Sequence, residues 1–313
     1  MARARGANAI MAASFETTYG TPPSTGYRKL PFVSSNLGEE QGLIPSDLLG
    51  YGREALPPSR DVINNDGDVV VPIDLRNFGN WLKLFMGQPV TTAITDGQQH
   101  VFSSGATNLP SMTVEVGLPE VPSYGQNFGV RGNTMRVQMQ RSGLLTATLG
   151  LIAQGENKLS ATGAGTPAEA SVERFSPFQG AVTRAGVALA SVTSADFTYS
   201  NGLEKVESIR GDGRIEDADP GMVMMSGSIT TRFRDTALLD QATAGDPVAL
   251  TFGWVTDAGR SLVFEVPAVY LPRAKTPVTG PNGVQATFNW QAAKDSVSGK
   301  TVIATLRNNV TTY

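Results

Sequence analysis

Short runs in which apolar and polar residues alternate with a period of two dominate the chain. Residues 112–116 read Met-Thr-Val-Glu-Val, residues 135–140 read Met-Arg-Val-Gln-Met-Gln, and residues 284–291 repeat the pattern with larger apolar side chains. Successive side chains of a strand point to opposite faces, so each run predicts an antiparallel strand with one buried and one wet face. Because turn residues separate the runs, the pattern predicts a mainly β fold.

Two helical segments interrupt the strands. Residues 77–86 place apolar side chains at helical spacing ahead of Gly87, and a weaker helix is expected over residues 236–242. We interpret the apolar side chains of the first helix as core residues packed on a β-sandwich: Phe78, Trp81, Leu82 and Phe85.

An internal repeat sets the expected organisation. Ile73 and Arg76 match Ile229 and Arg232 at an offset of about 156 residues, and residues 113–116 match residues 263–266 at an offset of about 150. The order strand, helix, strand, strand recurs, which predicts two similar domains. We expect an N-terminal arm over 1–26 that braces a neighbouring subunit, a first domain over 27–156, a linker over 157–173 and a second domain over 174–313.

Each predicted domain carries a long polar excursion at the same place in its repeat, over residues 42–67 and 201–221. Matching long loops suggest a shared contact role with neighbouring molecules, and flexible surface loops are the alternative. The acidic run in the second loop lacks the spacing of a calcium-binding loop, so no metal site is expected. The candidate contact residues are Leu48, Tyr51, Arg53, Arg60, Arg210, Asp212, Arg214 and Glu216.

The residues that are missing exclude several kinds of chemistry. The chain has no cysteine and a single histidine, His100, which we expect in an exposed polar loop. Thiolate nucleophiles, Cys-ligated metals and multi-histidine sites are therefore excluded, and neither catalysis nor a cofactor is expected. The net charge of −3 does not fit a strongly basic nucleic-acid binder. No signal peptide or long apolar stretch is found, so folding in a cytoplasm and no membrane contact are expected.

Several segments stand in a recognisable order along the chain. They are residues 15–23 (Phe-Glu-Thr-Thr-Tyr-Gly-Thr-Pro-Pro), 30–32 (Leu-Pro-Phe), the strand–helix unit at 67–87, and the segments 267–271, 280–284 and 302–308. Together they resemble the tail tube, or major tail, proteins of bacteriophages with long, non-contractile tails. The resemblance covers nearly the whole chain and rests on the order of the segments.

The resemblance implies a structural virion protein, assembled in the host cytoplasm, that is not an enzyme. In that family a small β-sandwich with one flanking helix contributes strands to a ring-wide β-barrel, and rings stack into the tube through which genomic DNA is ejected. The duplication is similar to the variant in which two fused tube domains form trimeric rings with pseudo-sixfold symmetry. The implied partners are other copies of the chain, a tape measure protein inside the tube, tail terminator and distal tail proteins at its ends, and double-stranded DNA in transit without sequence-specific binding.

The wet faces of the alternating strands are the candidate surface of the tube lumen. Carboxylates there would repel phosphates and let DNA slide, because phosphate contacts dominate DNA affinity. The alternative is an ordinary exposed carboxylate, with Glu115 paired to Arg136. The lumen-facing candidates are Glu115, Arg136, Gln138, Gln140, Glu265, Thr287 and Asn289.

Two other interpretations remain open at this point. One is a different virion protein, such as a distal tail or terminator ring protein. The other is a carbohydrate-binding β-sandwich, which would need exposed aromatic side chains around a groove. Trp81, Trp254 and Trp290 all lie in apolar-patterned segments, which argues against a sugar platform.

Overall fold

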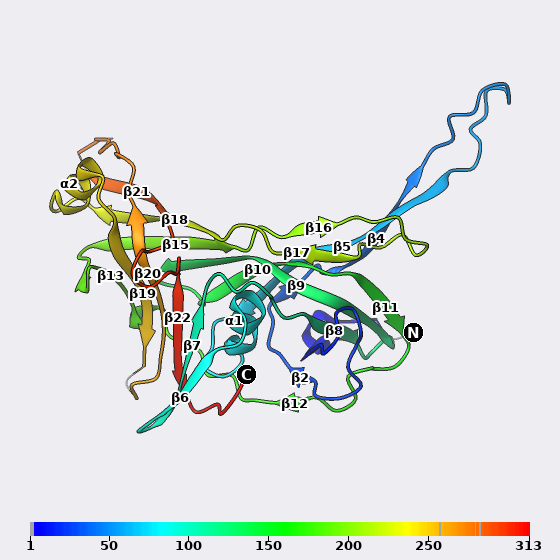
Figure 1. Cartoon of the computed structure of the whole chain (residues 1–313), viewed down its shortest axis with the longest axis horizontal. Coiled ribbons are helices and arrows are strands. Elements are labelled where there is room, and N and C mark those ends of the chain that lie inside the picture. Colours follow the sequence, from blue (N-terminus) through cyan, green and yellow to red (C-terminus); the bar gives the residue numbers. More distant parts are fainter. Residues whose placement is uncertain (1–2, 257, 279, 282) are drawn as a thin grey trace.

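Strands account for 48% of the chain and helices for 7%, which confirms the mainly β fold. The computed structural model describes residues 3–256, 258–278, 280–281 and 283–313 (Figure 1). Met1 and Ala2 of the expected arm, and Asn282 of the 280–284 segment, lie outside the described residues.

The first sheet belongs to the N-terminal half of the chain. Its strands lie in the order β12–β2–β1–β8–β9–β11, and all neighbours are antiparallel except β12 and β2. The bounds are β1 (Ile10–Phe15), β2 (Arg28–Lys29), β8 (Met112–Leu118), β9 (Ser123–Gln140), β11 (Gly155–Leu159) and β12 (Ala168–Glu169). Only the first part of β9, up to Val130, pairs in this sheet.

The remainder of β9 enters a second sheet, which contains strands from both halves of the chain and which we call the shared sheet. Its order is β4–β5–β10–β9–β15–β18–β21. The short strand β3 pairs with the last part of β5, along the same edge as β4. The bounds are β3 (Ser34–Ser35), β4 (Gly38–Ile44), β5 (Ser59–Pro72), β10 (Thr146–Ile152), β15 (Val192–Ser200), β18 (Met224–Arg232) and β21 (Gln285–Ala292).

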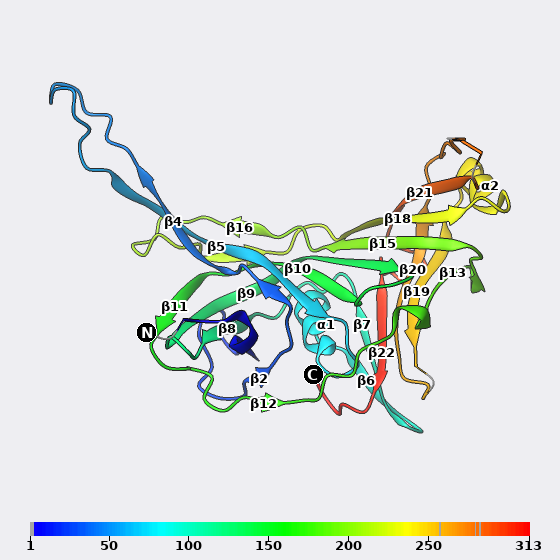
Figure 2. The same cartoon turned by 180° about the vertical axis from the view of Figure 1, so that it is seen from behind.

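A further set of strands, the outer sheet, runs across the shared sheet in Figures 1 and 2. Its order is β14–β13–β19–β20–β22–β7–β6, so it also contains strands from both halves. The bounds are β6 (Val90–Ile94), β7 (Gly97–Ser103), β13 (Gly180–Arg184), β14 (Val187–Ala188), β19 (Val248–Val255), β20 (Ser261–Tyr270) and β22 (Ile303–Asn308).

Helix α1 (Phe78–Met86) lies beneath the shared sheet and begins one residue later than expected. The Asp74 carboxylate accepts hydrogen bonds from the backbone nitrogens of Asn77 and Phe78, at 2.8 and 2.9 Å, which satisfies donors at the helix start. All four apolar residues expected in the core lie there, none more than 1% exposed. The other short elements are α2 (Ala237–Ala244), the 3₁₀ turns η1 (Gly6–Asn8) and η2 (Pro177–Gln179), and the hairpin of β16 (Glu204–Val206) and β17 (Asp217–Asp219).

The two segments expected to lie outside the domains each contain a strand that pairs within the first sheet. Residues 10–15 of the expected arm form β1, which pairs along its whole length with β8 of the same chain, and Met11, Ala12 and Ala13 are buried. The expected linker, 157–173, begins inside β11 and includes β12. Both segments bury apolar side chains and satisfy some of their backbone groups within their own chain.

His100 is buried, not exposed as expected. It lies on β7, its Nε2 donates to the carbonyl oxygen of Val310 at 2.9 Å, and its Nδ1 accepts from the hydroxyl of Thr91 at 2.8 Å. Its ring meets the ring of Tyr313 edge-on, with centroids 4.8 Å apart. The residue holds the C-terminal segment against the outer sheet, and the burial lowers its pKa below the ordinary value of 6.5.

No described helix is long and apolar enough to cross a membrane.

We expect this histidine to make stability depend on pH. Because its pKa is lower in the folded than in the unfolded chain, its contribution is fully present above about pH 6.5 and is lost as the pH falls through the folded-state pKa. The thermal midpoint of the wild type should therefore fall more between pH 7 and pH 5 than that of His100→Gln. Parallel midpoints for both proteins, measured by circular dichroism, would contradict this assignment.

Candidate functional site

The shared sheet has one face packed on the core and one face turned to solvent. On β9, Met135, Val137 and Met139 are buried whereas Arg136, Gln138 and Gln140 are exposed. The same alternation runs through β15, β18 and β21, so adjacent strands present their polar residues to the same side. We call this side the wet face.

Rows of cross-strand partners carry the wet face from one half of the chain to the other. Arg136 pairs with Thr198, Gln138 with Asp196, and Gln140 with Ser194, all across the β9–β15 junction. Because directly opposed side chains in a sheet lie on the same face, the junction leaves no break in the polar surface.

The rows continue into β18 and β21. Thr287 lies opposite Thr230 and Asn289 opposite Ser228, and the hydroxyl oxygens of the two threonines are 3.0 Å apart. The structure therefore brings together on one face five residues that the sequence nominated for the lumen: Arg136, Gln138, Gln140, Thr287 and Asn289.

Uncharged hydrogen-bonding side chains dominate the wet face around these residues. The Ser228 hydroxyl donates to the Asp196 carboxylate, which sits diagonally across the junction from Arg136. Among the described residues, Arg136 forms no ion pair. Sequence reasoning missed β15 as a contributor, although residues 194–200 carry the same period-two signal: Ser-Ala-Asp-Phe-Thr-Tyr-Ser.

Glu115 departs from the expected wet position. It lies on β8 in the first sheet, is 3% exposed, and accepts hydrogen bonds from the Thr162 hydroxyl and, at 2.8 Å, from the backbone nitrogen of Gly163. The segment after β11 folds over this face of β8, and the Glu115 carboxylate binds there and forms no ion pair with Arg136. Glu265 is exposed, but it lies on β20 in the outer sheet and not on the wet face.

The first long excursion is a hairpin that projects far beyond the body of the molecule (Figures 1 and 2). Strands β4 and β5 form its stem, and residues 45–58 form its tip. Apolar side chains are exposed along it, with Leu48 63%, Leu49 92% and Tyr51 66% accessible. Arg53 and Arg60 are exposed as well. Such exposure at a protruding element indicates an interaction surface.

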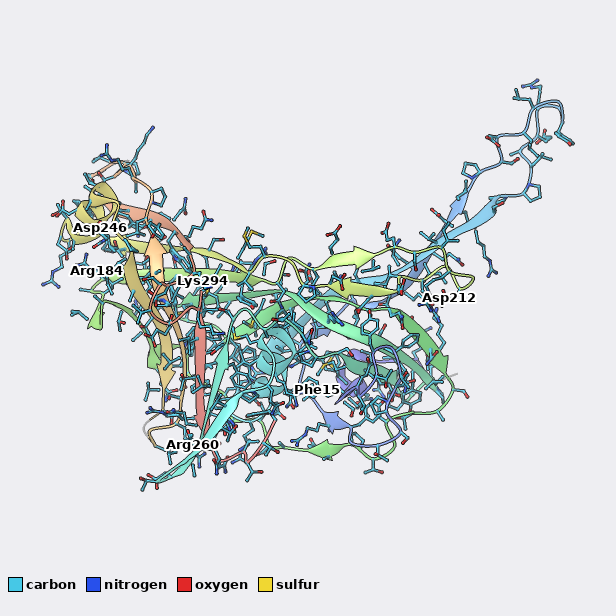
Figure 3. All side chains as sticks on the ribbon, viewed as in Figure 1. Phe15, Arg184, Asp212, Asp246, Arg260 and Lys294 are labelled. Carbon is cyan, nitrogen blue, oxygen red and sulfur yellow. The ribbon has the colours of Figure 1, made fainter. Side chains whose placement is uncertain are left out.

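The second long excursion folds back on its own chain instead of projecting. Arg214 forms an ion pair with Glu39 at 2.9 Å, and its guanidinium lies over the ring of Phe128. Arg210 pairs locally with Asp212, which Figure 3 places beside the base of the hairpin.

The rest of this excursion also contacts the first half of the chain. The carbonyl oxygen of Glu216 accepts from the side-chain amide of Gln154, and Lys205 pairs with Asp66 at 2.8 Å. Of the four candidates of this loop, Arg214 contacts the hairpin stem through Glu39, Glu216 contacts Gln154, and Arg210 and Asp212 pair with each other. Within the described residues, no group of three or more His, Asp or Glu side chains is arranged to hold a metal ion.

Both edges of the shared sheet are open. In the described part of the chain, β4 pairs only with β5, and β21 meets a second strand only where Gln291 and Ala292 pair with β20. Unpaired strand edges expose backbone donors and acceptors and are templates for pairing with another chain.

Comparison with known proteins agrees with this geometry. A family model described as phage tail tube protein matches residues 6–292. None of the curated proteins matches the chain.

Removal of the Glu115 carboxylate tests its structural placement. Glu115→Ala removes a buried carboxylate and leaves the Thr162 hydroxyl and the Gly163 backbone N–H without their acceptor, and we expect a loss of about 1.5–3 kcal/mol in the free energy of unfolding. The matched control, Glu265→Ala, removes an exposed carboxylate and should change stability by about 0.5 kcal/mol or less. Equal effects of the two changes in urea unfolding would contradict the burial of Glu115.

Proposed function

Because the chain belongs to the phage tail tube protein family, we propose that three copies close their shared sheets edge to edge into a ring, and that rings stack into the tube of a long, non-contractile tail. The family is one of structural, non-enzymatic virion proteins. Its members associate with copies of themselves to form a tube and with other tail components. The observation that carries the proposal is the shared sheet, with strands from both halves, one polar face and two open edges.

The width of the shared sheet favours three copies over six. Its order β4–β5–β10–β9–β15–β18–β21 gives about 21 strands in a trimer, which at about 4.8 Å spacing and 45° tilt makes a backbone diameter of roughly 45 Å. Inward side chains reduce this to a bore of roughly 35 Å, wide enough for a DNA duplex of about 20 Å. Six copies would leave a bore of about 80 Å.

In this proposal, the two halves of each chain occupy the positions that two separate subunits would occupy in a hexameric ring. We assign the tube domains to residues 27–156 and 174–313, with β1 from the segment before residue 27 completing the first domain. In the shared sheet the first half supplies β4, β5, β10 and β9, and the second supplies β15, β18 and β21. Three chains would then present six similar but unequal domains, which is pseudo-sixfold symmetry.

The wet face lines the bore in this arrangement, and DNA passes along it into the host. Each Lys or Arg contact with a phosphate adds attraction, so a surface of hydroxyl and amide groups suits passage without retention. Asp196 occupies the diagonal position across the β9–β15 junction from Arg136, so the wet face carries a carboxylate as well as this one cation of β9. The tape measure protein occupies the bore before ejection, and terminator and distal tail proteins cap the tube ends.

The hairpin of β4 and β5 reaches an adjacent ring. It continues the direction of β5 past the end of the sheet, and strands in a barrel run obliquely along the barrel axis (Figure 2). A ring stacked at that end meets the exposed tip first.

The stoichiometry can be measured directly. Purified protein should form rings or tubes in negative stain, and native mass spectrometry of isolated rings should give three chains of 33.0 kDa each. A ring of six chains would overturn the closure proposed here. Monomers at all concentrations would overturn the tube function itself.

The position of the wet face can be tested in assembled tubes, since the chain has no cysteine of its own. Gln138→Cys and Thr287→Cys should react with a small maleimide but not with a maleimide-dextran too wide for the bore. The control, Asp96→Cys in the exposed turn between β6 and β7, should react with both reagents. Labelling of residue 138 or 287 by the wide reagent would place the wet face on the outside of the tube.

A further inference from the structure

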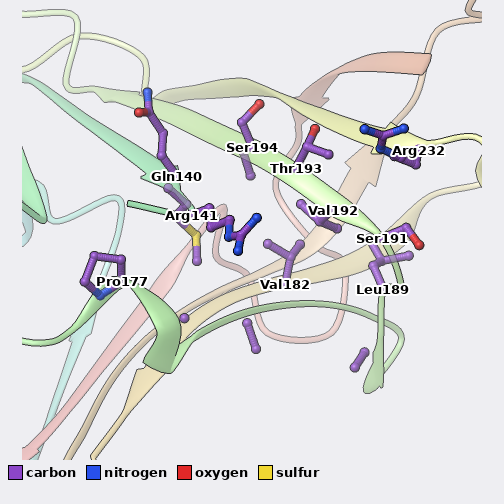
Figure 4. Close-up of a pocket in the computed structure, with 15 residues that line it drawn as sticks. Gln140, Arg141, Pro177, Val182, Leu189, Ser191, Val192, Thr193, Ser194 and Arg232 are labelled. Carbon is purple, nitrogen blue, oxygen red and sulfur yellow. The ribbon is translucent and has the colours of Figure 1, made fainter. Parts of the chain in front are cut away.

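A hollow lies at the end of the shared sheet opposite the hairpin. It has a volume of about 630 Å³ and opens between the end of β9, the start of β15 and the β13–β14 hairpin. Figure 4 shows Val182, Leu189 and Val192 facing its interior, and the buried side chains of Met139 and Ala195 also line it. We call it the β13–β15 groove.

Two arginines are the only charged residues that line the groove among those described. Arg141 lies in the middle of the hollow in Figure 4, and Arg232 lies at its far end beside Ser191. Neither forms an ion pair with another described residue. The groove therefore combines apolar walls with unneutralised positive charge.

The tip of the β4–β5 hairpin has the complementary properties. Leu48 and Leu49 are exposed at 63% and 92%, and nothing in their own chain covers them. Asp47 and Glu54 flank the exposed leucines, against the single cation Arg53, so the tip is net negative. An apolar, acidic tip fits an apolar, basic groove in both respects.

The two features lie at opposite ends of the same sheet. The hairpin extends from one end, whereas β9 ends and β15 begins at the other, near the Arg184 labelled in Figure 3. Stacking of identical rings along the strand direction brings the hairpin end of one ring against the groove end of the next. A contact of this kind joins different patches on two copies and propagates as an open stack.

From these observations we propose that the tip of the β4–β5 hairpin of one copy inserts Leu48 and Leu49 into the β13–β15 groove of a copy in the neighbouring ring. The proposal rests on the tube function and adds to it the identity of the receiving surface. The leucines fill the apolar part of the groove, and Asp47 and Glu54 approach Arg141 and Arg232.

Cysteine cross-linking tests the insertion. The double variant L49C/S191C places one thiol at the tip and one at the groove rim, in a chain without other cysteines. A short bismaleimide should join copies into dimers and longer ladders in tubes, and should give no ladder in dispersed rings. The control L49C/D96C carries a thiol of similar exposure in the β6–β7 turn, away from the groove, and should give no ladder.

Charge reversal tests the complementarity. R141E/R232E should raise the protein concentration needed for tube formation by about tenfold or more while leaving the thermal midpoint of the unassembled protein unchanged. Adding D47K/E54K to that variant should restore assembly, whereas D47K/E54K alone should impair it.

The outcomes separate this inference from the function on which it rests. If tubes form but L49C/S191C gives no more cross-linked product than the control, the tip binds elsewhere and the inference is overturned. The inference is also overturned if the quadruple variant R141E/R232E/D47K/E54K fails to restore assembly. If the unaltered protein forms no tubes, the proposed tube function is overturned, and the inference falls with it.

Discussion

Backbone hydrogen bonding between β9 and β15 joins strands from different halves of the chain into one sheet. Strand β9 is long enough to belong to the first sheet at its start and to the shared sheet at its end, so it fixes the position of one sheet against the other. Asn201, at the end of β15, reinforces the junction by donating to the carbonyl oxygens of Phe85 and Gly132 at 2.9 and 2.8 Å. The single wet face and the two outer edges both depend on this junction.

The sequence predicted those features that depend only on local spacing. Alternation along β9 and β21 assigned the exposed sides of Gln138 and Asn289 to the wet face, and helical spacing assigned Trp81 to the core. The repeat identified corresponding strand–helix units in the two halves, because similar local patterns produce similar elements. The family assignment likewise agrees with the order of motifs, each of which is loose when taken alone.

The remaining features depend on contacts between distant segments, which local spacing does not report. Alternation predicts that Glu115 lies on the face of β8 opposite its apolar neighbours. It does not predict that the distant segment around Thr162 covers that face. A polar sequence around His100 suggested a loop, whereas its partner Val310 lies near the other end of the chain. The two long excursions look alike in composition, yet ion pairs such as Arg214–Glu39 and Lys205–Asp66 hold the second one down, whereas in the described part of the chain the hairpin tip, residues 45–58, forms none.

The hairpin has a geometric consequence that reaches past a single ring. Its stem is a continuation of β5, so its direction follows the tilt of a strand in the sheet and not the conformation of an independent loop. In the proposed tube, each stacking contact made through such a stem would rotate the next ring by an angle set by the strand tilt. The helical twist of such a filament would then be encoded in the curvature of one sheet, and a substitution that flattens the sheet would change the helical pitch without altering any residue at the ring-to-ring contact.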